Sequence, residues 1–245
     1  MTRIPRIVGH RGAAKAAPEN TLESLRAAKR QGAACVEVDA KLTADNAIIL
    51  MHDDILDRTT SGQGLVAQAT LEQIRALDAG SWLAPNWAGV RVPTLEEAVQ
   101  ELTRLGLNCN VEIKPCPGRE LVTAELVMRA LQRLWPAQAE KPLISSFAYE
   151  SLRVAHRLAP EFPRAVLVDE VPATWQDLCA GVEAIALNPW HKTLTPEWTR
   201  AVKAAGLKVL TYTVNETSRA QELFDWGVDA VFSDVPGQLI DALGA

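Results

Sequence analysis

The chain has 245 residues, of which 48% are hydrophobic and 22% are charged, and its formal net charge at pH 7 is −5. This composition is that of an ordinary globular protein, long enough for one α/β barrel or two small domains. The acidic and basic residues are interspersed, so no basic tract predicts binding to nucleic acid or to an anionic membrane surface. No apolar run reaches the ~18 residues that a membrane-spanning helix needs.

Further features suggest the compartment of the protein. We expect no signal peptide, because a polar His-Arg pair already occurs at residue 10. The four cysteines form no Cys-x-x-Cys pair, so a zinc or redox site is not expected. We therefore expect a cytoplasmic protein with no stable membrane association.

The first predicted strand covers residues 6–10 and ends in His10 and Arg11. This end presents a proton-transfer group beside a fixed cation. A buried strand with a chance polar end is the simpler interpretation. However, further polar clusters fall at the ends of later predicted segments, at residues 37–39, 51–53, 110–114 and 145–147.

A helix is predicted next, because Asn20 can cap a helix that has Glu23 three residues later, and Gly32 suits its end. Helix capping is therefore one interpretation of Glu19 and Asn20, and a role at a site is the other. The spacing of these residues in the sequence does not distinguish the two interpretations.

The second predicted strand, residues 34–41, places Glu37 and Asp39 on one face because they are two residues apart. A hairpin turn at Asp45 and Asn46 follows, and residues 48–52 return antiparallel. A two-residue turn there predicts that His52 lies opposite Asp39, close to both carboxylates.

Residues 54–92 have the composition of a small insertion, with a short helix at residues 70–77, and long loops in compact domains are often functional lids. Regular βα alternation then follows. Thr94 and Glu97 predict a capping box for a helix that ends near Gly106. Six more strands are predicted, each followed by a helix, at residues 109–113, 143–146, 165–168, 184–187, 208–214 and 230–233.

Without the return arm of the hairpin, the sequence contains eight strands that are each followed by a helix. This count predicts a TIM barrel formed by residues 1–245 as one domain, with residues 54–92 inserted after the second strand. An open doubly wound sheet is the second choice, but no glycine-rich phosphate-binding motif follows the first strand. In a barrel the polar clusters would meet at the carboxyl ends of the strands.

Three carboxylates, Glu37, Asp39 and Glu112, would converge at this end of the barrel. Unpaired carboxylates packed together repel one another, so we expect a bound cation or protonation. Oxygen ligands favour Mg²⁺ or Ca²⁺ over zinc. Ion pairing with Arg11 and Lys114 is the alternative interpretation of the three carboxylates.

Arg11 and Lys114 would add positive charge beside this cluster and suit a phosphoryl group. His10 and His52 can supply an acid and a base near neutral pH. Together these residues predict metal-assisted cleavage of a phosphodiester, with a base for the nucleophile and an acid for the leaving alkoxide.

The remaining aromatic and histidine residues carry weaker signals. Phe147, Tyr212 and Trp190 could contact the organic part of a substrate, although ordinary packing explains each of them equally well. We expect His156 to be a surface residue of a helix and His191 to be a loop residue.

The sequence resembles the glycerophosphodiester phosphodiesterase family, and most of all its cytoplasmic bacterial branch. The motifs that carry the resemblance span nearly the whole chain and are, in order, His10-Arg11-Gly12, Pro18-Glu19-Asn20-Thr21, Glu37-Val38-Asp39, His52-Asp53, Val111-Glu112-Ile113-Lys114, Ser145-Ser146-Phe147, Tyr212-Thr213-Val214-Asn215 and Ser233-Asp234-Val235-Pro236. The family often has tryptophan at the position of Tyr212 and threonine at that of Ser233, which affects substrate contacts and not the reaction.

The resemblance implies a TIM barrel with a small insertion after the second strand. It implies that His10 and His52 are the acid–base pair. It also implies that the three carboxylates, Glu37, Asp39 and Glu112, bind the metal, and that Arg11 and Lys114 hold the phosphate.

The expected reaction is hydrolysis of a small glycerophosphodiester to sn-glycerol 3-phosphate and an alcohol. A phosphoinositide-cleaving phospholipase C would need a membrane-facing apolar rim, of which the sequence gives no clear sign. A non-catalytic phosphate-binding barrel would be expected to lack one of the histidines or carboxylates. The sequence does not decide which histidine is the base or whether water or a substrate hydroxyl attacks phosphorus. It also leaves open which alcohol is preferred and whether the chain forms a homodimer.

Overall fold

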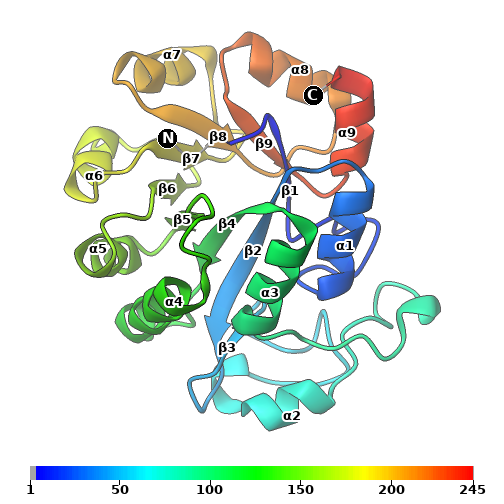
Figure 1. Cartoon of the computed structure of the whole chain (residues 1–245). Helices are drawn as coiled ribbons and strands as arrows, with labels where there is room; N and C mark the ends of the chain where they lie inside the picture. The colour runs from blue at the N-terminus through cyan, green and yellow to red at the C-terminus, as the bar shows by residue number, and fades with distance from the viewer. Residues whose placement is uncertain (1–3, 245) are drawn as a thin grey trace.

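Eight parallel strands surrounded by helices form a closed barrel in the computed structural model, which describes residues 4–244 (Figure 1). The strands of the barrel, in chain order, are β1 (Ile7–Gly9), β2 (Cys35–Leu42), β4 (Asn108–Ile113), β5 (Leu143–Ser146), β6 (Arg164–Val168), β7 (Ala186–Pro189), β8 (Lys208–Thr211) and β9 (Ala230–Ser233). Strand β1 pairs with β9 on one side and with β2 on the other. This pairing closes the barrel, so the TIM-barrel prediction is confirmed and the open doubly wound sheet is excluded.

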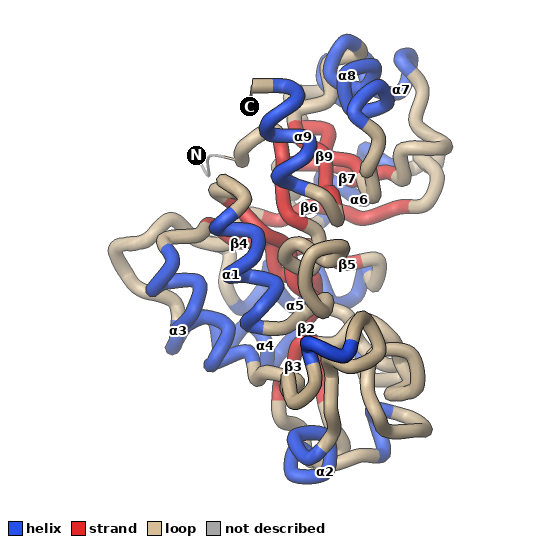
Figure 2. The backbone as a smooth tube through the Cα atoms, turned by 90° about the vertical axis from the view of Figure 1, so that its right-hand side faces the viewer, coloured by secondary structure: helices blue, strands red, loops and turns tan. Residues whose placement is uncertain are grey.

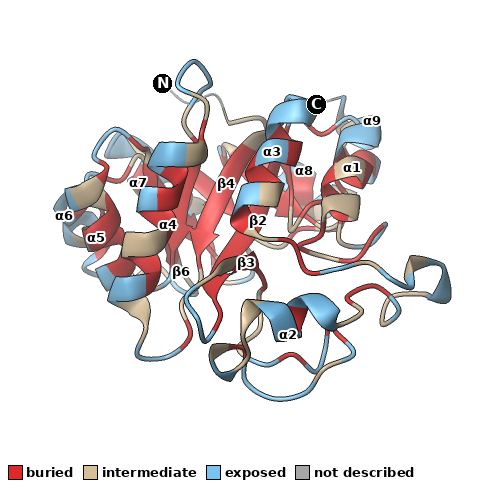
Figure 3. Ribbon diagram, turned by 60° about the horizontal axis from the view of Figure 1, so that its bottom comes forward, coloured by how far each residue is buried: buried red, intermediate tan, exposed pale blue. Residues whose placement is uncertain are grey.

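Each barrel strand leads to a helix on the outside of the barrel. The helices are α1 (Leu22–Arg30), α3 (Leu95–Leu105), α4 (Glu120–Leu134), α5 (Tyr149–Leu158), α6 (Trp175–Gly181), α7 (Pro196–Ala204), α8 (Thr217–Asp225) and α9 (Pro236–Leu243). Their inner faces are buried and their outer faces are exposed (Figure 3). Within the described residues, no helix is both long and apolar enough to cross a membrane.

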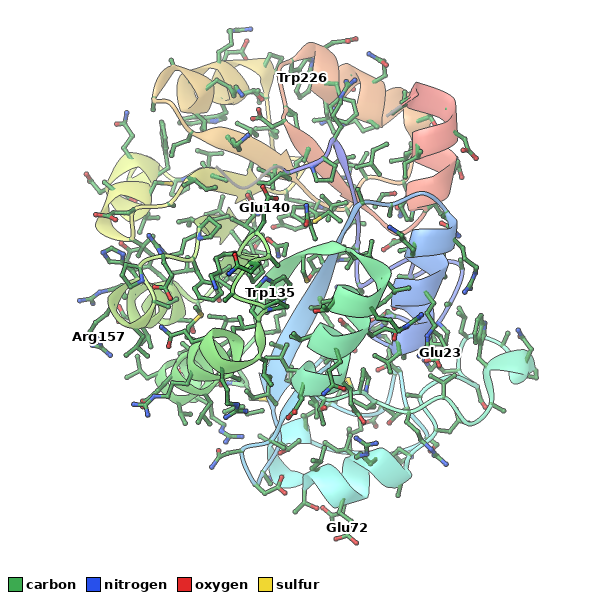
Figure 4. The ribbon with its side chains drawn as sticks, viewed as in Figure 1. Glu23, Glu72, Trp135, Glu140, Arg157 and Trp226 are labelled. Atoms are coloured by element: carbon green, nitrogen blue, oxygen red, sulfur yellow. The ribbon has the colours of Figure 1, made fainter. Side chains whose placement is uncertain are left out.

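Apolar residues pack in two layers. The main core lies between the outward faces of the strands and the helices, and a smaller cluster that includes Val8, Leu210 and Phe232 fills the barrel interior. At the amino-terminal end of the barrel, the indole of Trp135 after α4 is buried and donates to the carbonyl of Glu140, 2.8 Å away (Figure 4). Apolar side chains thus fill the amino-terminal part of the barrel, and the carboxyl ends of the strands are left for polar side chains.

The predicted capping box of α3 is confirmed. The Thr94 side chain accepts from the Glu97 backbone N–H, and the Glu97 carboxylate accepts from the Thr94 N–H. Gly106 ends this helix in the left-handed conformation, with φ of 61°.

The predicted start of α1 is wrong by one residue. Thr21 is the N-cap in an extended conformation, and it forms a capping box with Ser24. Asn20 has φ of 56°, which is incompatible with the extended backbone that an N-cap requires. The amide of Asn20 is therefore available for another partner.

The hairpin prediction is correct in topology and wrong in register. Strand β3 (Ile48–Leu50) runs antiparallel to β2, with Ala40 paired to Leu50. The N–H of Met51, not of His52, donates to the Asp39 carbonyl at 3.0 Å. The loop between the paired residues Thr43 and Ala47 has three residues instead of two, and its third residue, Asn46, has φ of 62°.

The segment after β3 projects from the barrel at the edge where α2 lies (Figure 2). It contains two short 3₁₀ turns, η1 (Val66–Gln68) and η2 (Pro85–Trp87), and the helix α2 (Leu71–Ala76). Glu72 of α2 points away from the barrel (Figure 4). The apolar side chains of this segment form a small cluster that includes Ile74 and also Cys116 from the loop after β4. Because this cluster is small and also includes Ile49 of β3 and Cys116, we propose that residues 54–92 are an appendage of a single barrel domain.

Candidate active site

A cavity of about 330 Å³ opens at the carboxyl ends of the strands. Every site residue predicted from the sequence lines it, except Asp39, which belongs to the buried carboxylate cluster beside it. The lining residues are His10, Arg11, Glu37, His52, Asn110, Glu112, Lys114, Ser145, Phe147, Leu167, Trp190, Tyr212, Thr213 and Phe232. The fold therefore brings together residues from both ends of the chain.

Three carboxylates form the acidic cluster. Glu37 and Asp39 point inward from β2, and Glu112 lies beside Asp39 in the parallel register of β2 and β4. One oxygen from each lies within 4.8 Å of the other two, although the side chains are almost fully buried, with residue exposures of 4%, 1% and 8%. Three buried carboxylates at this separation need positive charge or protons to compensate them.

Among residues 4–244, lysine and arginine side chains form ion pairs with two of these carboxylates. Lys114 Nζ is 2.8 Å from Glu112, and Arg11 Nε is 3.3 Å from Asp39. Glu37 Oε2 accepts from the Arg11 backbone N–H at 3.0 Å and lies 4.0 Å from His10 Nε2, whereas Oε1 is buried with no hydrogen-bond partner among the described residues. The unpartnered oxygen and the all-oxygen donor set fit a hard divalent cation.

The pKa values of the cluster reflect this crowding. Burial and the charges of Asp39 and Glu112 raise the pKa of Glu37 well above its usual value. Burial and the Asp39 charge raise the pKa of Glu112 to about 7. Burial also opposes ionisation of Asp39, but the charges of Arg11, His52 and Lys114 outweigh burial and lower its pKa to about 2. Without a cation, Glu37 and Glu112 tend to hold protons that a bound metal ion would displace.

The two histidines have the same local arrangement. His10 Nδ1 is 2.7 Å from Asp234 Oδ1, and His52 Nδ1 is 2.7 Å from Asp53 Oδ1. Asp234 is held in turn by the amide of Asn215 at 2.8 Å. A carboxylate that accepts from Nδ1–H fixes the ring and its tautomer, and it leaves Nε2 free to exchange a proton. Burial lowers the pKa of His52, despite the opposing charge of Asp39.

The two cationic side chains of the site, Arg11 and Lys114, lie next to carboxylates. Arg11 adopts φ of 50°, which lets its backbone N–H face Glu37 while its guanidinium donates to Glu19 at 2.7 Å. Lys114 lies between Glu112 and the face of Phe147, whose centroid is 5.0 Å from Nζ. Both cations line the cavity, so they can attract an anionic ligand there.

Aromatic and aliphatic side chains form the opposite wall. Phe147 packs edge-to-face with Tyr212, with ring centroids 5.7 Å apart. The Tyr212 hydroxyl donates to the Val168 carbonyl at 3.0 Å, so Tyr212 offers its ring to the cavity. Leu167 and Trp190 extend this wall. The cavity is thus polar on one side and apolar on the other, as ligand sites commonly are.

The sequence left two interpretations open for Glu19 and Asn20, helix capping and a role at the site. Asn20 donates to Asp39 Oδ2 at 2.7 Å and accepts from the Asp39 N–H at 3.1 Å, so helix capping is the wrong interpretation of Asn20. Glu19 binds Arg11 and Arg58. The sequence contained a signal for this role, because Glu19 and Asn20 belong to one of the motifs that resemble the family, Pro18-Glu19-Asn20-Thr21.

The other two histidines lie outside the cavity. His191 is a loop residue, as predicted, and its carbonyl accepts from Arg219. His156 on α5 is half-buried, and its Nδ1 is buried without a partner, so its interpretation as a surface residue is wrong in part.

The fold and the cavity define a class of protein. It is a TIM barrel whose strand ends carry a buried carboxylate cluster, two cations and two histidine–carboxylate pairs around a small cavity. Such a site is suited to binding a small anion and cleaving it with acid–base chemistry.

Comparison with known proteins places the chain within this class. The model of the glycerophosphoryl diester phosphodiesterase family matches residues 10–238. A glycerophosphodiester phosphodiesterase of Bacillus subtilis is 36% identical, with 94% of this chain and 83% of the relative aligned. One from Caldanaerobacter subterraneus is 33% identical, with 96% of each chain aligned. The chain therefore belongs to the glycerophosphoryl diester phosphodiesterase family and is a hydrolase of phosphodiesters.

A solved structure is closely similar as well. A phosphodiesterase from Oleispira antarctica, in complex with its product sn-glycerol-3-phosphate, superposes with a TM-score of 0.96. The two are 38% identical, and the match covers 99% of this chain and 98% of the other.

Proposed function

We propose that this protein hydrolyses glycerophosphodiesters to sn-glycerol 3-phosphate and an alcohol. The observation that carries the proposal is one small cavity that holds the carboxylate cluster, two cations and two histidine–carboxylate pairs. The product bound in the Oleispira antarctica phosphodiesterase supports the same substrate class. A volume of about 330 Å³ suits a small diester.

Glu37, Asp39 and Glu112 would hold a divalent cation, either Mg²⁺ or Ca²⁺. When bound, the cation supplies charge stabilisation for a phosphoryl oxygen and lowers the pKa of a hydroxyl beside it. Arg11 provides a planar guanidinium for two phosphate oxygens, and Lys114 provides a point charge. Together these groups stabilise the negative charge that develops on phosphorus oxygens in the transition state.

His10 and His52 would transfer the protons. One Nε2 removes a proton from the attacking hydroxyl, and the other protonates the leaving alkoxide oxygen. Asp234 and Asp53 accept from the Nδ1–H groups and stabilise each imidazolium as it forms. The attacking hydroxyl belongs either to water or to the 2-position of the glycerol, which would give a cyclic phosphate before water opens it.

Phe147 and Tyr212 would cover the carbon skeleton of the substrate. They lie on one wall with Trp190 and do not surround a space, so they form no cage for a quaternary ammonium. We therefore propose that the glycerol half is recognised and that different alcohol headgroups are accepted.

The test is release of sn-glycerol 3-phosphate from glycerophosphocholine, measured with a coupled dehydrogenase. We expect turnover with Mg²⁺ or Ca²⁺, and turnover lower by roughly 10²–10⁴-fold in the His10→Ala variant. Release of inositol phosphates from phosphatidylinositol without turnover of glycerophosphocholine would instead indicate a phospholipase C. Binding of glycerophosphocholine without turnover would indicate a non-catalytic barrel.

A further inference from the structure

Arg58 of the inserted segment joins two loops of the mouth of the barrel. Its Nε and Nη2 donate to the two oxygens of Asp53 at 2.6 and 3.0 Å. Its Nη1 and Nη2 donate to the two oxygens of Glu19 at 2.8 Å each. The planar guanidinium thus binds both carboxylates in bidentate fashion, a geometry that lysine cannot reproduce.

Each of these carboxylates holds a residue of the site. Asp53 accepts from His52 Nδ1 at 2.7 Å. Glu19 accepts from Arg11 Nη1 at 2.7 Å, and Arg11 Nε lies 3.3 Å from Asp39. Hydrogen bonds and ion pairs therefore run without a break from His52 through Asp53, Arg58 and Glu19 to Arg11 and the carboxylate cluster.

Arg58 itself is remote from the chemistry. It does not line the cavity, and 43% of its side chain is exposed. Its effect would therefore be indirect. Without the guanidinium, Asp53 and Glu19 would be like charges facing each other across the gap that it fills, and they would move apart. Their movement would displace His52 and Arg11, which they hold.

We propose that Arg58 is a positioning residue that sets His52 and Arg11 in place relative to each other and so makes the inserted segment part of the catalytic apparatus. The inference rests on the proposed function, since Arg58 acts through two residues of that site. Misplacement of a reacting group by a fraction of an ångström lowers the rate of chemistry more than it weakens binding of the substrate.

The experiment compares Arg58→Ala with a matched control, Arg75→Ala. Arg75 also lies in the inserted segment and also reaches the barrel, through an ion pair with Glu97 at 2.7 Å, and its exposure is 44%. We expect Arg58→Ala to lower kcat by roughly 10- to 100-fold with KM changed less than about threefold. Arg75→Ala should keep kcat within about twofold, and both variants should melt at similar temperatures. Equal kcat values in the two variants would overturn the proposal.

Chemical rescue separates positioning from simple loss of an ion pair. Because Arg58 is partly exposed, millimolar guanidinium chloride should restore much of the kcat of Arg58→Ala, whereas ammonium chloride should not. Arg58→Lys, which keeps the charge and the fold, should stay impaired because one ammonium cannot hold both carboxylates in bidentate fashion. Wild-type kcat in Arg58→Lys would contradict the proposal.

A double-mutant cycle identifies the path of the effect. If Arg58 acts mainly through Asp53, the Asp53→Asn, Arg58→Ala double variant should be scarcely slower than the slower single variant. Fully multiplicative losses in this cycle and in the matching Glu19→Gln cycle would overturn the proposal. Failure of the proposed function would look different, because the wild-type protein itself would release no sn-glycerol 3-phosphate.

Discussion

The two halves of the barrel mouth differ in chemistry. The half built by β1, β2 with its antiparallel partner β3, and β4 carries almost all the charge around the cavity: the two histidines, the acidic cluster and the two cations. The half built by β5 to β9 contributes mainly Phe147, Leu167, Trp190, Tyr212 and Phe232. We call these the charged half and the aromatic half. From this difference we propose that the charged half performs the reaction and that the aromatic half shapes the space for the substrate.

The two histidines of the charged half are supported in different ways. Asp53, the partner of His52, is held by Arg58 from the inserted segment. Asp234, the partner of His10, follows β9 and is held by Asn215 within the barrel. His52 thus depends on a segment outside the regular barrel, whereas His10 depends on residues that follow β8 and β9. Variants in each half should therefore have distinct kinetic effects.

Removal of a bound metal ion should have the largest effect, since the buried cluster of Glu37, Asp39 and Glu112 at the centre of the charged half has only partial charge compensation from Arg11 and Lys114. Exhaustive dialysis against a chelator should abolish release of sn-glycerol 3-phosphate, and adding Mg²⁺ or Ca²⁺ should restore it. Full turnover in the presence of the chelator would refute a metal-dependent reaction. Isothermal titration with each cation provides a readout that is independent of activity.

Substitution of either histidine should have the next largest effect. His10→Ala and His52→Ala should each lower kcat by roughly 10²–10⁴-fold, the usual contribution of a general acid or base. Their thermal unfolding should stay close to that of the wild type, because both residues line the cavity and lie outside the apolar core. If one variant kept near-normal kcat, that histidine would not be an acid or base.

Substitutions of the neighbouring residues Asn20 and Thr21 should distinguish a role at the carboxylate cluster from a role in capping α1. Asn20→Ala removes both contacts to Asp39 and should lower kcat/KM by roughly 10- to 100-fold. Thr21→Ala removes the α1 cap and should lower the free energy of unfolding by about 1 kcal/mol with kcat little changed. The reverse pattern would show that Asn20 matters for the helix and not for the cluster.

The aromatic half should give the smallest effects. Phe147→Ala should raise KM severalfold and leave kcat nearly unchanged, because an exposed ring contributes about 1 kcal/mol of contact. Choline, ethanolamine, serine and glycerol diesters of glycerol 3-phosphate should differ in kcat/KM by less than about tenfold. A strong preference for one headgroup, lost in Phe147→Ala, would show that the aromatic half selects the alcohol.

The amino-acid sequence by itself determined the order of the elements and the family. Eight strand–helix units follow from local hydrophobic patterns, and closure of the barrel follows from their number. The alternation of side chains along β2 was enough to place Glu37 and Asp39 on one face, because a strand has a period of two. Motifs at strand ends were enough to indicate which residues would meet.

Only the tertiary structure decided the partners of those residues. Asn20 with Glu23 and Thr21 with Ser24 are overlapping capping patterns, and the positive φ of Asn20 excludes the first. The hairpin register depends on whether the loop has two or three residues, which Asp45 and Asn46 permit equally. His10 meets Asp234 across 224 positions of the chain, and Arg58 meets Glu19 across 39. Such contacts form because the closed barrel brings its loops together, and no local pattern of residues predicts them.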